Sequence, residues 1–248
     1  MHRPFPQAAL AIVILSAGCH TGRVPGSSAA VPISHSASSG TVVYPPGFDD
    51  GRRYPVVVIL PASNGPASQM LRYYAPPRDA IVVLSAGIGT PDDYATGAAW
   101  SATIARYERQ LIADVDALSS RGQVDTRHVV LAGFSMGGDL AWALALRNPE
   151  RVHGAVIMAS RASYRRRAGD HTVLADHGMR FFFTIGDVED RARVNGARAA
   201  ARLLDAVGAA CIYREISGGH VRAPPDVFAE ALRFVMADTP VPTACLPH

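Results

Sequence analysis

The chain has 248 residues, of which 48% are apolar and 18% charged, and this composition excludes an intrinsically disordered protein. Its net charge of +3 is too small to indicate nucleic-acid binding. All 24 basic residues are arginines, and the absence of lysine excludes a Schiff-base lysine, a Ser-Lys dyad and a P-loop lysine. The three cysteines lie far apart without metal-ligand spacing, which excludes a cysteine-rich zinc site.

Residues 1–19 predict an export signal. His2 and Arg3 precede an apolar run, residues 8–15, that is too short to span a bilayer, and small residues then lead to Cys19. The ending LSAGC resembles a bacterial lipobox, in which the cysteine is acylated, although Ser16 replaces the usual aliphatic residue. We therefore expect export, either as a periplasmic or cell-envelope lipoprotein attached to the membrane through Cys19 or as a secreted protein after ordinary cleavage.

Residues 20–40 are rich in serine, glycine and proline and predict a flexible linker, which places the folded domain over residues 41–248. In an oxidising compartment, Cys211 and Cys245 are able to form a disulfide. The alternative is a buried free thiol at Cys211 and an exposed one at Cys245, because the sequence gives no distance between them.

The rest of the chain alternates short β-branched runs with longer amphipathic stretches. Runs that are apolar on both faces predict strands of a parallel sheet at residues 54–60, 80–86, 127–133, 152–159, 179–185 and 210–216. Apolar residues at helical spacing predict helices over residues 99–120, 136–147, 194–207 and 225–236, and residues 41–44 favour an antiparallel leading strand. The pattern predicts one α/β domain with a mostly parallel sheet covered by helices on both faces, and ligands bind such sheets at the carboxyl ends of strands.

A G-x-S-x-G motif, residues 133–137, stands between the third predicted strand and an Ala/Leu-rich helix. A serine on a tight strand-to-helix turn presents its Oγ above the sheet, and the small residues Gly133 and Gly137 let strand and helix approach each other. The helix N-terminus also favours negative charge that develops there. Ser135 is therefore the candidate nucleophile, and the alternative is a glycine-rich turn with an idle serine.

A serine hydroxyl needs a base to remove its proton, and His220 is the candidate. Among the nine histidines, only His220 combines a loop that follows a strand with flexible glycines, in the segment SGGH at 217–220. The others fall in the N-terminal tail, at the C-terminus, in the predicted strands (His128 and His153) or in the loop before the fifth strand (His171 and His177).

Three carboxylates after the fifth predicted strand compete to orient the histidine: Asp187, Glu189 and Asp190. An acid needs several residues of loop to swing from the strand end under the imidazole, which favours Glu189 or Asp190 over Asp187. The resulting order along the chain is serine, acid, histidine.

With the motifs GFSMGG and GGH, residues 41 to 236 resemble the α/β-hydrolase superfamily, as a small bacterial serine esterase. The chain is similar to the group of feruloyl esterases, polyhydroxyalkanoate depolymerases, dienelactone hydrolases and phospholipase/carboxylesterases.

Lid domains of this fold are commonly inserted between the fourth and fifth strands, where residues 160–178 are too few to form one. In these families the acid stands either three residues after a strand-end glycine, here Glu189, or first in a D-x-x-R-x-N pattern, here Asp190. We expect Asp190.

Acyl transfer also needs two N–H donors for the oxyanion. The first is expected to be the backbone N–H of Met136, directly after the nucleophile, and the second comes from the loop after the first core strand. Families of this type usually carry His-Gly there, whereas this chain has LPASNG at 60–65. By position we assign the second donor to Ser63, with Ala62 and Asn64 as alternatives.

Several side chains near these loops are candidates for recognition or packing. Arg161 and Arg165–Arg167 form either a recognition patch for an anionic group or, as we favour, a solvated loop. Tyr94 and Trp100 are candidates to line an acyl or aryl pocket, whereas Trp142 is expected in the core.

The sequence thus predicts an exported serine hydrolase that cleaves carboxylic esters through an acyl-enzyme, by a Ser-His-Asp triad of Ser135, His220 and Asp190. This mechanism needs no metal or cofactor, and its partner is a small-molecule or polymeric ester. The alternatives are a thioesterase or peptidase with the same triad, and a non-catalytic surface lipoprotein that binds ligands.

Overall fold

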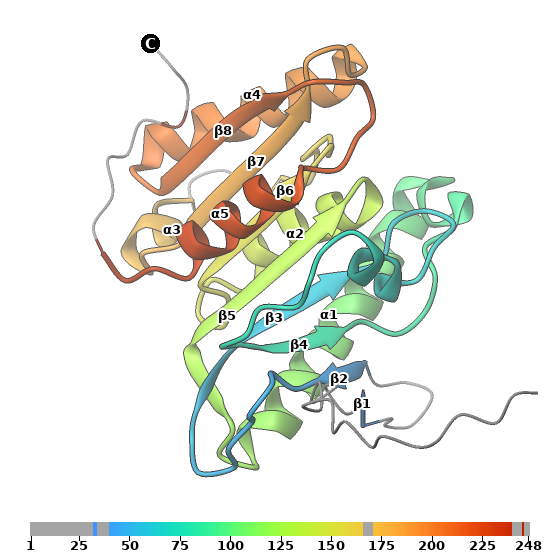
Figure 1. Ribbon diagram of the computed structural model, residues 1–248. Helices are drawn as coiled ribbons and strands as arrows, with labels where there is room; N and C mark the ends of the chain where they lie inside the picture. Colours follow the sequence, from blue (N-terminus) through green and yellow to red (C-terminus); the bar gives the residue numbers. More distant parts are fainter. Residues whose placement is uncertain (1–31, 34–39, 166–170, 240–244, 246–248) are drawn as a thin grey trace, which may run out of the picture.

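A computed structural model describes residues 32–33, 40–165, 171–239 and 245 (Figure 1). The expected export signal with Cys19 and most of the expected linker lie outside these residues. The elements are, in chain order, β1 (Pro32–Ile33), β2 (Thr41–Val43), β3 (Tyr54–Leu60), the 3-10 helix η1 (Ala67–Arg72), β4 (Ile81–Leu84), the 3-10 helix η2 (Pro91–Tyr94), α1 (Gly97–Ser119), β5 (Val124–Phe134), α2 (Met136–Arg147), β6 (Gly154–Met158), α3 (Thr172–Asp176), β7 (Arg180–Gly186), α4 (Arg191–Val207), β8 (Ala210–Ile216) and α5 (Pro225–Val235).

The strands form one sheet in the order β1-β2-β4-β3-β5-β6-β7-β8. Strands β3 to β8 pair in parallel, and β2 is antiparallel to both β1 and β4, as predicted for the leading strand. The expected start of the domain at residue 41 is too late. Pro32 pairs with Val43 in the sheet, and the N–H of Gly40 donates to the Asp114 carboxylate at 3.0 Å, so segments of the expected linker are part of the fold.

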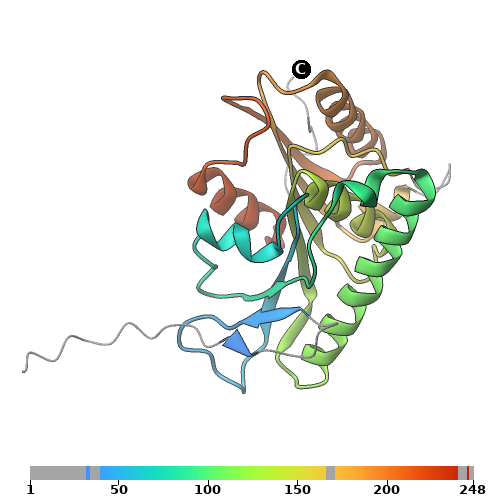
Figure 2. The same ribbon diagram turned by 90° about the vertical axis from the view of Figure 1, so that its right-hand side faces the viewer.

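Helices cover both faces of the sheet, as Figure 2 shows in a view along its edge. Helices α1, α2 and α4 pack on one face, and α5 with η1 on the other. Alternate residues of β3 enter the two layers: Val56 and Val58 join the core on the α2 side, and Val57 and Ile59 the core on the α5 side. Burial on both faces explains why the strands read as continuous apolar runs, and it confirms the α/β prediction.

The four predicted helices are confirmed as α1, α2, α4 and α5, with shifts at their ends. Helix α4 begins at Arg191 and not at residue 194, because the side chain of Asp190 accepts a hydrogen bond from the N–H of Arg193 and caps the helix. The short elements α3, η1 and η2 were not predicted from the sequence. Within the described part of the chain, no helix has both the length and the apolar character needed to cross a membrane.

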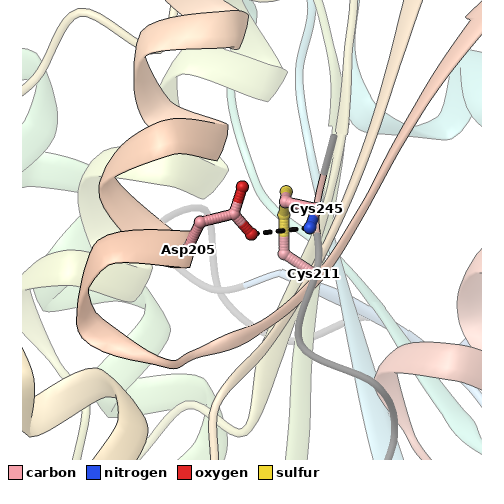
Figure 3. The surroundings of a disulfide bond; sticks show 3 residues. All are labelled: Asp205, Cys211 and Cys245. Carbon is pink, nitrogen blue, oxygen red and sulfur yellow. Dashed lines mark hydrogen bonds between the residues drawn. A yellow bond between two sulfur atoms is a disulfide. The ribbon is translucent and has the colours of Figure 1, made fainter. Parts of the chain in front are cut away.

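Cys211 and Cys245 form a disulfide that fastens the C-terminal segment to β8, the edge strand of the sheet (Figure 3). Their Cα atoms lie 4.7 Å apart, and both residues are buried. The N–H of Cys245 donates to the Asp205 carboxylate at 2.6 Å, and its carbonyl accepts from the N–H of Tyr213 at 3.1 Å. Of the two states left open by the sequence, the structure therefore has the disulfide.

We expect removal of this disulfide to destabilise the protein. The bond closes a loop between positions 34 residues apart, and the loss of that constraint on the unfolded chain costs about 2–4 kcal/mol. A Cys211→Ala/Cys245→Ala variant should show this decrease in the free energy of unfolding by urea denaturation. A reductant should destabilise the native protein and leave the variant unchanged; equal responses of the two proteins would contradict the prediction.

Candidate active site

Ser135 occupies a strained turn between β5 and α2. Its backbone angles are φ 58° and ψ −119°, a combination that non-glycine residues rarely adopt and that costs on the order of 1–3 kcal/mol. Two hydrogen bonds hold the turn: the Ser135 N–H donates to the carbonyl of Met158 at 2.9 Å, and its carbonyl accepts from the N–H of Asp139 at 3.0 Å. The strand–turn–helix predicted from the motif is confirmed, with Ser135 at the carboxyl end of a central strand.

The glycines that flank Ser135 are required by close backbone contacts. A Cβ on Gly133 would lie 2.2 Å from the backbone of Gly137, and a Cβ on Gly137 would lie 2.7 Å from the carbonyl oxygen of Leu60. Both distances are shorter than van der Waals contact, and the obstructing atoms belong to the backbone. The structure therefore agrees with the reason inferred from the G-x-S-x-G spacing, which is that strand and helix approach each other too closely for a side chain.

His220 lies within hydrogen-bonding distance of both Ser135 and a carboxylate. Its Nε2 is 2.9 Å from the Oγ of Ser135, and its Nδ1 is 2.7 Å from an oxygen of Glu189. The ring packs beside Phe134 with 4.8 Å between centroids. The two residues predicted from separate motifs, 85 positions apart, are thus in contact through their reactive atoms.

The acid in contact with His220 is Glu189, and the expectation of Asp190 is wrong. The Asp190 carboxylate accepts from the N–H of Arg193 at the start of α4, and its other oxygen pairs with the Arg193 guanidinium. Although partial burial acts to raise it, the pKa of Asp190 is lowered by this N–H and by the charge of Arg193. Its side chain remains 45% exposed and belongs to the helix cap.

Glu189 precedes this cap by one residue, and its side chain is directed into the protein. Only 3% of the side chain is exposed. One carboxylate oxygen faces His220, and the other accepts from the N–H of Asp190 at 3.0 Å. The carboxylate is therefore fixed by hydrogen bonds beneath the imidazole, in the position that the sequence reasoning had given to its neighbour.

Asp187, the third candidate, joins the two loops that carry Glu189 and His220. Its carboxylate accepts from the N–H of Gly218 at 2.9 Å, and the Val188 N–H donates to the carbonyl of Gly218 at 3.1 Å. The loops lie so close that a Cβ on Gly186 would be 2.0 Å from the carbonyl oxygen of Gly219. The three acids therefore have different partners: Glu189 contacts His220, Asp190 caps α4, and Asp187 binds the loop that carries His220.

The predicted oxyanion donors lie around the N-terminus of α2. Met136 is the first residue of this helix, so its N–H has no acceptor within the helix. The close contact of Gly137 with the carbonyl of Leu60 brings the loop after β3 beside this turn. The Asn64 N–H is excluded as the second donor because it donates to the carbonyl of Gly89 at 2.6 Å, which leaves Ser63 and Ala62.

Asp139, in the first turn of α2, is a supporting residue that the sequence reasoning missed. It is buried and accepts hydrogen bonds from Ser160 Oγ at 2.6 Å, from the Arg161 and Ala162 N–H groups and from the hydroxyl of Tyr94 at 2.9 Å. Burial and then the Asp139 carboxylate raise the pKa of Tyr94. Asp139 thus fixes the loop after β6 behind the nucleophile, and its only signal in the sequence is a carboxylate in an apolar helix.

The other side chains singled out in the sequence have mainly packing roles. Tyr94 stacks on Trp100 with 4.7 Å between ring centroids, so Asp139 and Trp100 together fix the Tyr94 ring. Trp142 is fully buried against Phe181, as expected of a core residue. Arg165 donates to the backbone carbonyls of its own loop, and residues 166–167 lie outside the described part of the chain.

Large apolar side chains are exposed on segments that follow the carboxyl ends of strands. Tyr73, Ile88 and Val188 are the large apolar side chains that remain exposed in the described residues, and each lies in a segment that follows a strand of the sheet. A cavity of about 320 Å³ beside His220 is lined in part by Tyr73, Tyr74 and Arg222. The described residues between β6 and β7 contain only the five-residue helix α3, and the His220 side chain is 37% exposed. The described residues therefore leave His220 partly exposed to solvent.

Comparison with known proteins identifies the fold. A family model described as the alpha/beta hydrolase fold matches residues 84–202. No curated protein sequence matches the chain. The strand order, the strained serine turn and this match together show that the chain has the α/β-hydrolase fold.

Solved structures of the same fold include several esterases. An S-formylglutathione hydrolase from Staphylococcus aureus has a TM-score of 0.58 at 15% identity, over 86% of this chain and 97% of that one. A carboxylesterase from Bacillus cereus has a TM-score of 0.57 at 16% identity, over 73% of this chain and 87% of that one. A dipeptidyl peptidase 4 from Porphyromonas gingivalis has a TM-score of 0.54 at 15% identity over 79% of this chain. The chain spans only about a third of the length of that peptidase and of a similar dipeptidyl aminopeptidase from Bacteroides ovatus.

Proposed function

We propose that this protein is a serine hydrolase that cleaves carboxylic esters with a triad of Ser135, His220 and Glu189. The observation that carries the proposal is the hydrogen-bonded series from Ser135 Oγ through both ring nitrogens of His220 to the buried Glu189 carboxylate. Such a series activates a hydroxyl that is otherwise a weak nucleophile. The similarity to several solved esterases adds support at the level of the fold.

In this mechanism, Ser135 Oγ attacks the ester carbonyl while His220 Nε2 takes its proton. Glu189 accepts from Nδ1–H, which fixes the tautomer of the ring and stabilises the imidazolium that forms. The amides of Met136 and Ser63 are assigned to the oxyanion. His220 then returns the proton to the leaving alcohol, and water attacks the acyl-enzyme by the same sequence of transfers.

We infer that the substrate carries an apolar or aromatic group. The exposed side chains of Tyr73, Ile88 and Val188 lie in segments at the catalytic edge of the sheet, where an apolar substrate would remove them from water. A thioester or a peptide could be attacked by the same triad, so these remain alternative substrates, as does a purely ligand-binding role of the fold.

The test uses the full-length protein with p-nitrophenyl esters of increasing acyl length, a thioester and a chromogenic peptide, together with a fluorophosphonate probe. We expect turnover of esters, and covalent labelling confined to the tryptic peptide that contains Ser135. A preference for the thioester or the peptide would reassign the substrate class. An absence of both turnover and labelling would refute the enzyme proposal and favour the ligand-binding alternative.

We further propose that the protein is exported and that Cys19 is acylated. The N-terminal sequence pattern supports this, and the Cys211–Cys245 disulfide is of a kind that persists in oxidising compartments. The intact mass of the protein recovered separately from the membrane, the cytosol and the medium tests it. A chain beginning at Cys19 with added acyl groups supports the lipoprotein, an unmodified chain cleaved near this position supports a secreted form, and an uncleaved cytosolic chain contradicts export.

A further inference from the structure

A second group of polar side chains lies at the other end of the sheet from the triad. His128 lies in β5 six residues before its end, His153 directly precedes β6, and Asp238 follows α5. One ligand atom from each residue, a ring nitrogen or a carboxylate oxygen, lies within 4.8 Å of the others. Since a strand advances roughly 3.3 Å per residue, His128 is on the order of 20 Å from Ser135 and has no part in the triad.

The ring of His128 is oriented by carboxylates on both sides. Its Nδ1 is 2.9 Å from an oxygen of Asp125, and its Nε2 is 2.9 Å from an oxygen of Asp238. A histidine that binds a metal commonly donates its other N–H to a carboxylate in this way. Asp125 is therefore the orienting partner of His128, and the Nε2 of His128 faces Asp238.

The ring of His153 lies beside that of His128, with 5.0 Å between their centroids. Its Nε2 is buried and has no hydrogen-bond partner within the described residues, whereas the backbone carbonyl of Ala237 accepts a hydrogen bond from this histidine. The bonded nitrogen is therefore Nδ1, and Nε2 is left with an unused lone pair.

We propose that His128, His153 and Asp238 form a binding site for a zinc ion. Two imidazole nitrogens and one carboxylate oxygen are ligands that zinc prefers, and zinc binds three protein groups and a water with tetrahedral geometry. Two cavities, of about 570 and 330 Å³, are both lined by His153, and the smaller one is also lined by Asp238. On binding, zinc replaces the proton that joins His128 Nε2 to Asp238, and this proton is released to solvent.

Two arginines near the site offset the negative charge of its carboxylates. Each of them also donates hydrogen bonds to acceptors of its own. Arg127 pairs with Asp125, and the Arg180 guanidinium donates to the backbone carbonyls of Ala237 and Thr239. Without a metal, the His128 ring is held by hydrogen bonds between the carboxylates of Asp125 and Asp238. The two states differ at His153, because these hydrogen bonds make no use of its Nε2 and the metal does.

The site would fasten the chain that follows α5 to the amino ends of β5 and β6. The three ligands come from positions that are distant in sequence, so their connection by an ion constrains the unfolded chain strongly. We therefore expect the metal to stabilise this end of the fold. Ester hydrolysis by the triad is expected to persist in protein treated with a chelator, which keeps this proposal separate from the proposed function.

The test uses the untagged full-length protein, freed of metal with a chelator and titrated with zinc by calorimetry and by thermal unfolding. We expect one zinc per chain and, at 100 times the dissociation constant, a rise in the unfolding temperature of roughly 5–10 °C. His153→Gln and Asp238→Asn should abolish the rise, and Asp125→Asn should weaken binding about 10- to 100-fold. Cobalt binding followed by visible absorption should give the intense bands of a tetrahedral site.

His177→Gln provides the matched control. His177 lines both cavities but is not one of the three ligands, so its replacement should leave zinc binding unchanged. Binding that persists undiminished in His153→Gln would overturn the proposal, because the unpartnered Nε2 would then have no role. An absence of saturable zinc binding to the native protein would overturn it as well and leave His128 as a residue that only hydrogen-bonds to Asp125 and Asp238.

Discussion

A Ser135→Ala variant is expected to lose about 10⁶-fold in kcat for ester hydrolysis, because serine and histidine act as a unit. The loss corresponds to about 8 kcal/mol of transition-state stabilisation. Alanine keeps the volume of the turn and removes only the hydroxyl that contacts His220 at 2.9 Å. Steady-state kinetics with a p-nitrophenyl ester that the native protein accepts will measure the effect.

The same substitution should leave the fold intact. The strain at this turn belongs to the backbone, at φ 58°, and alanine adopts this conformation no more easily than serine does. We therefore expect similar unfolding temperatures for the two proteins. Turnover retained within tenfold by a folded Ser135→Ala protein would refute the assignment of the nucleophile.

A Glu189→Gln variant is expected to lose about 10⁴-fold in kcat, as removal of the acid from such triads does. The amide remains able to accept or donate at Nδ1, but it no longer enforces the tautomer in which Nε2 faces Ser135, and it does not stabilise the imidazolium. Because the Glu189 side chain is only 3% exposed, the loss of its charge is poorly compensated by water. Comparison of kcat with the native protein, at matched folded fractions, provides the measurement.

The adjacent Asp190→Asn is the matched control, since it makes the same chemical change one residue away. Asparagine caps a helix about as well as aspartate, so α4 should be retained and kcat should change by no more than a few-fold. Asp187→Asn likewise keeps an acceptor for the N–H of Gly218. If Asp190→Asn proved the more severe of the two changes, the acid read from the structure would be wrong.

The strands and the nucleophile turn were predictable because their signals are local. Strand β3 is a run of valines and isoleucine that is buried on both faces, and its bounds match the prediction at both ends. Before Ser135, a glycine at 133 is required by contact with the backbone of Gly137, four residues away in the sequence. Such short-range constraints remain visible in the sequence without knowledge of the fold.

The acid was mispredicted because two local patterns overlap. Asp190 fits the pattern of an acid followed by Arg193, but that pattern serves a helix cap, which is itself a strong local preference. Which of three carboxylates reaches His220 depends on the direction of each side chain in the turn after β7, and that direction changes between neighbouring residues. Strand β1 was also not predicted. It lies in a serine-rich stretch, and such a composition does not indicate a strand.

The amino-acid sequence by itself determined the alternation of strands and helices, the strained serine and the glycine-bound histidine loop, because each follows from preferences within a few residues. The tertiary structure decided the contacts between distant segments: Glu189 with His220, Cys211 with Cys245, and His128 with Asp238 across 110 positions. These contacts depend on how strand ends align in the sheet and on where its loops turn. Their geometry is set by the packing of the whole domain, and for this reason no local pattern of residues encodes it.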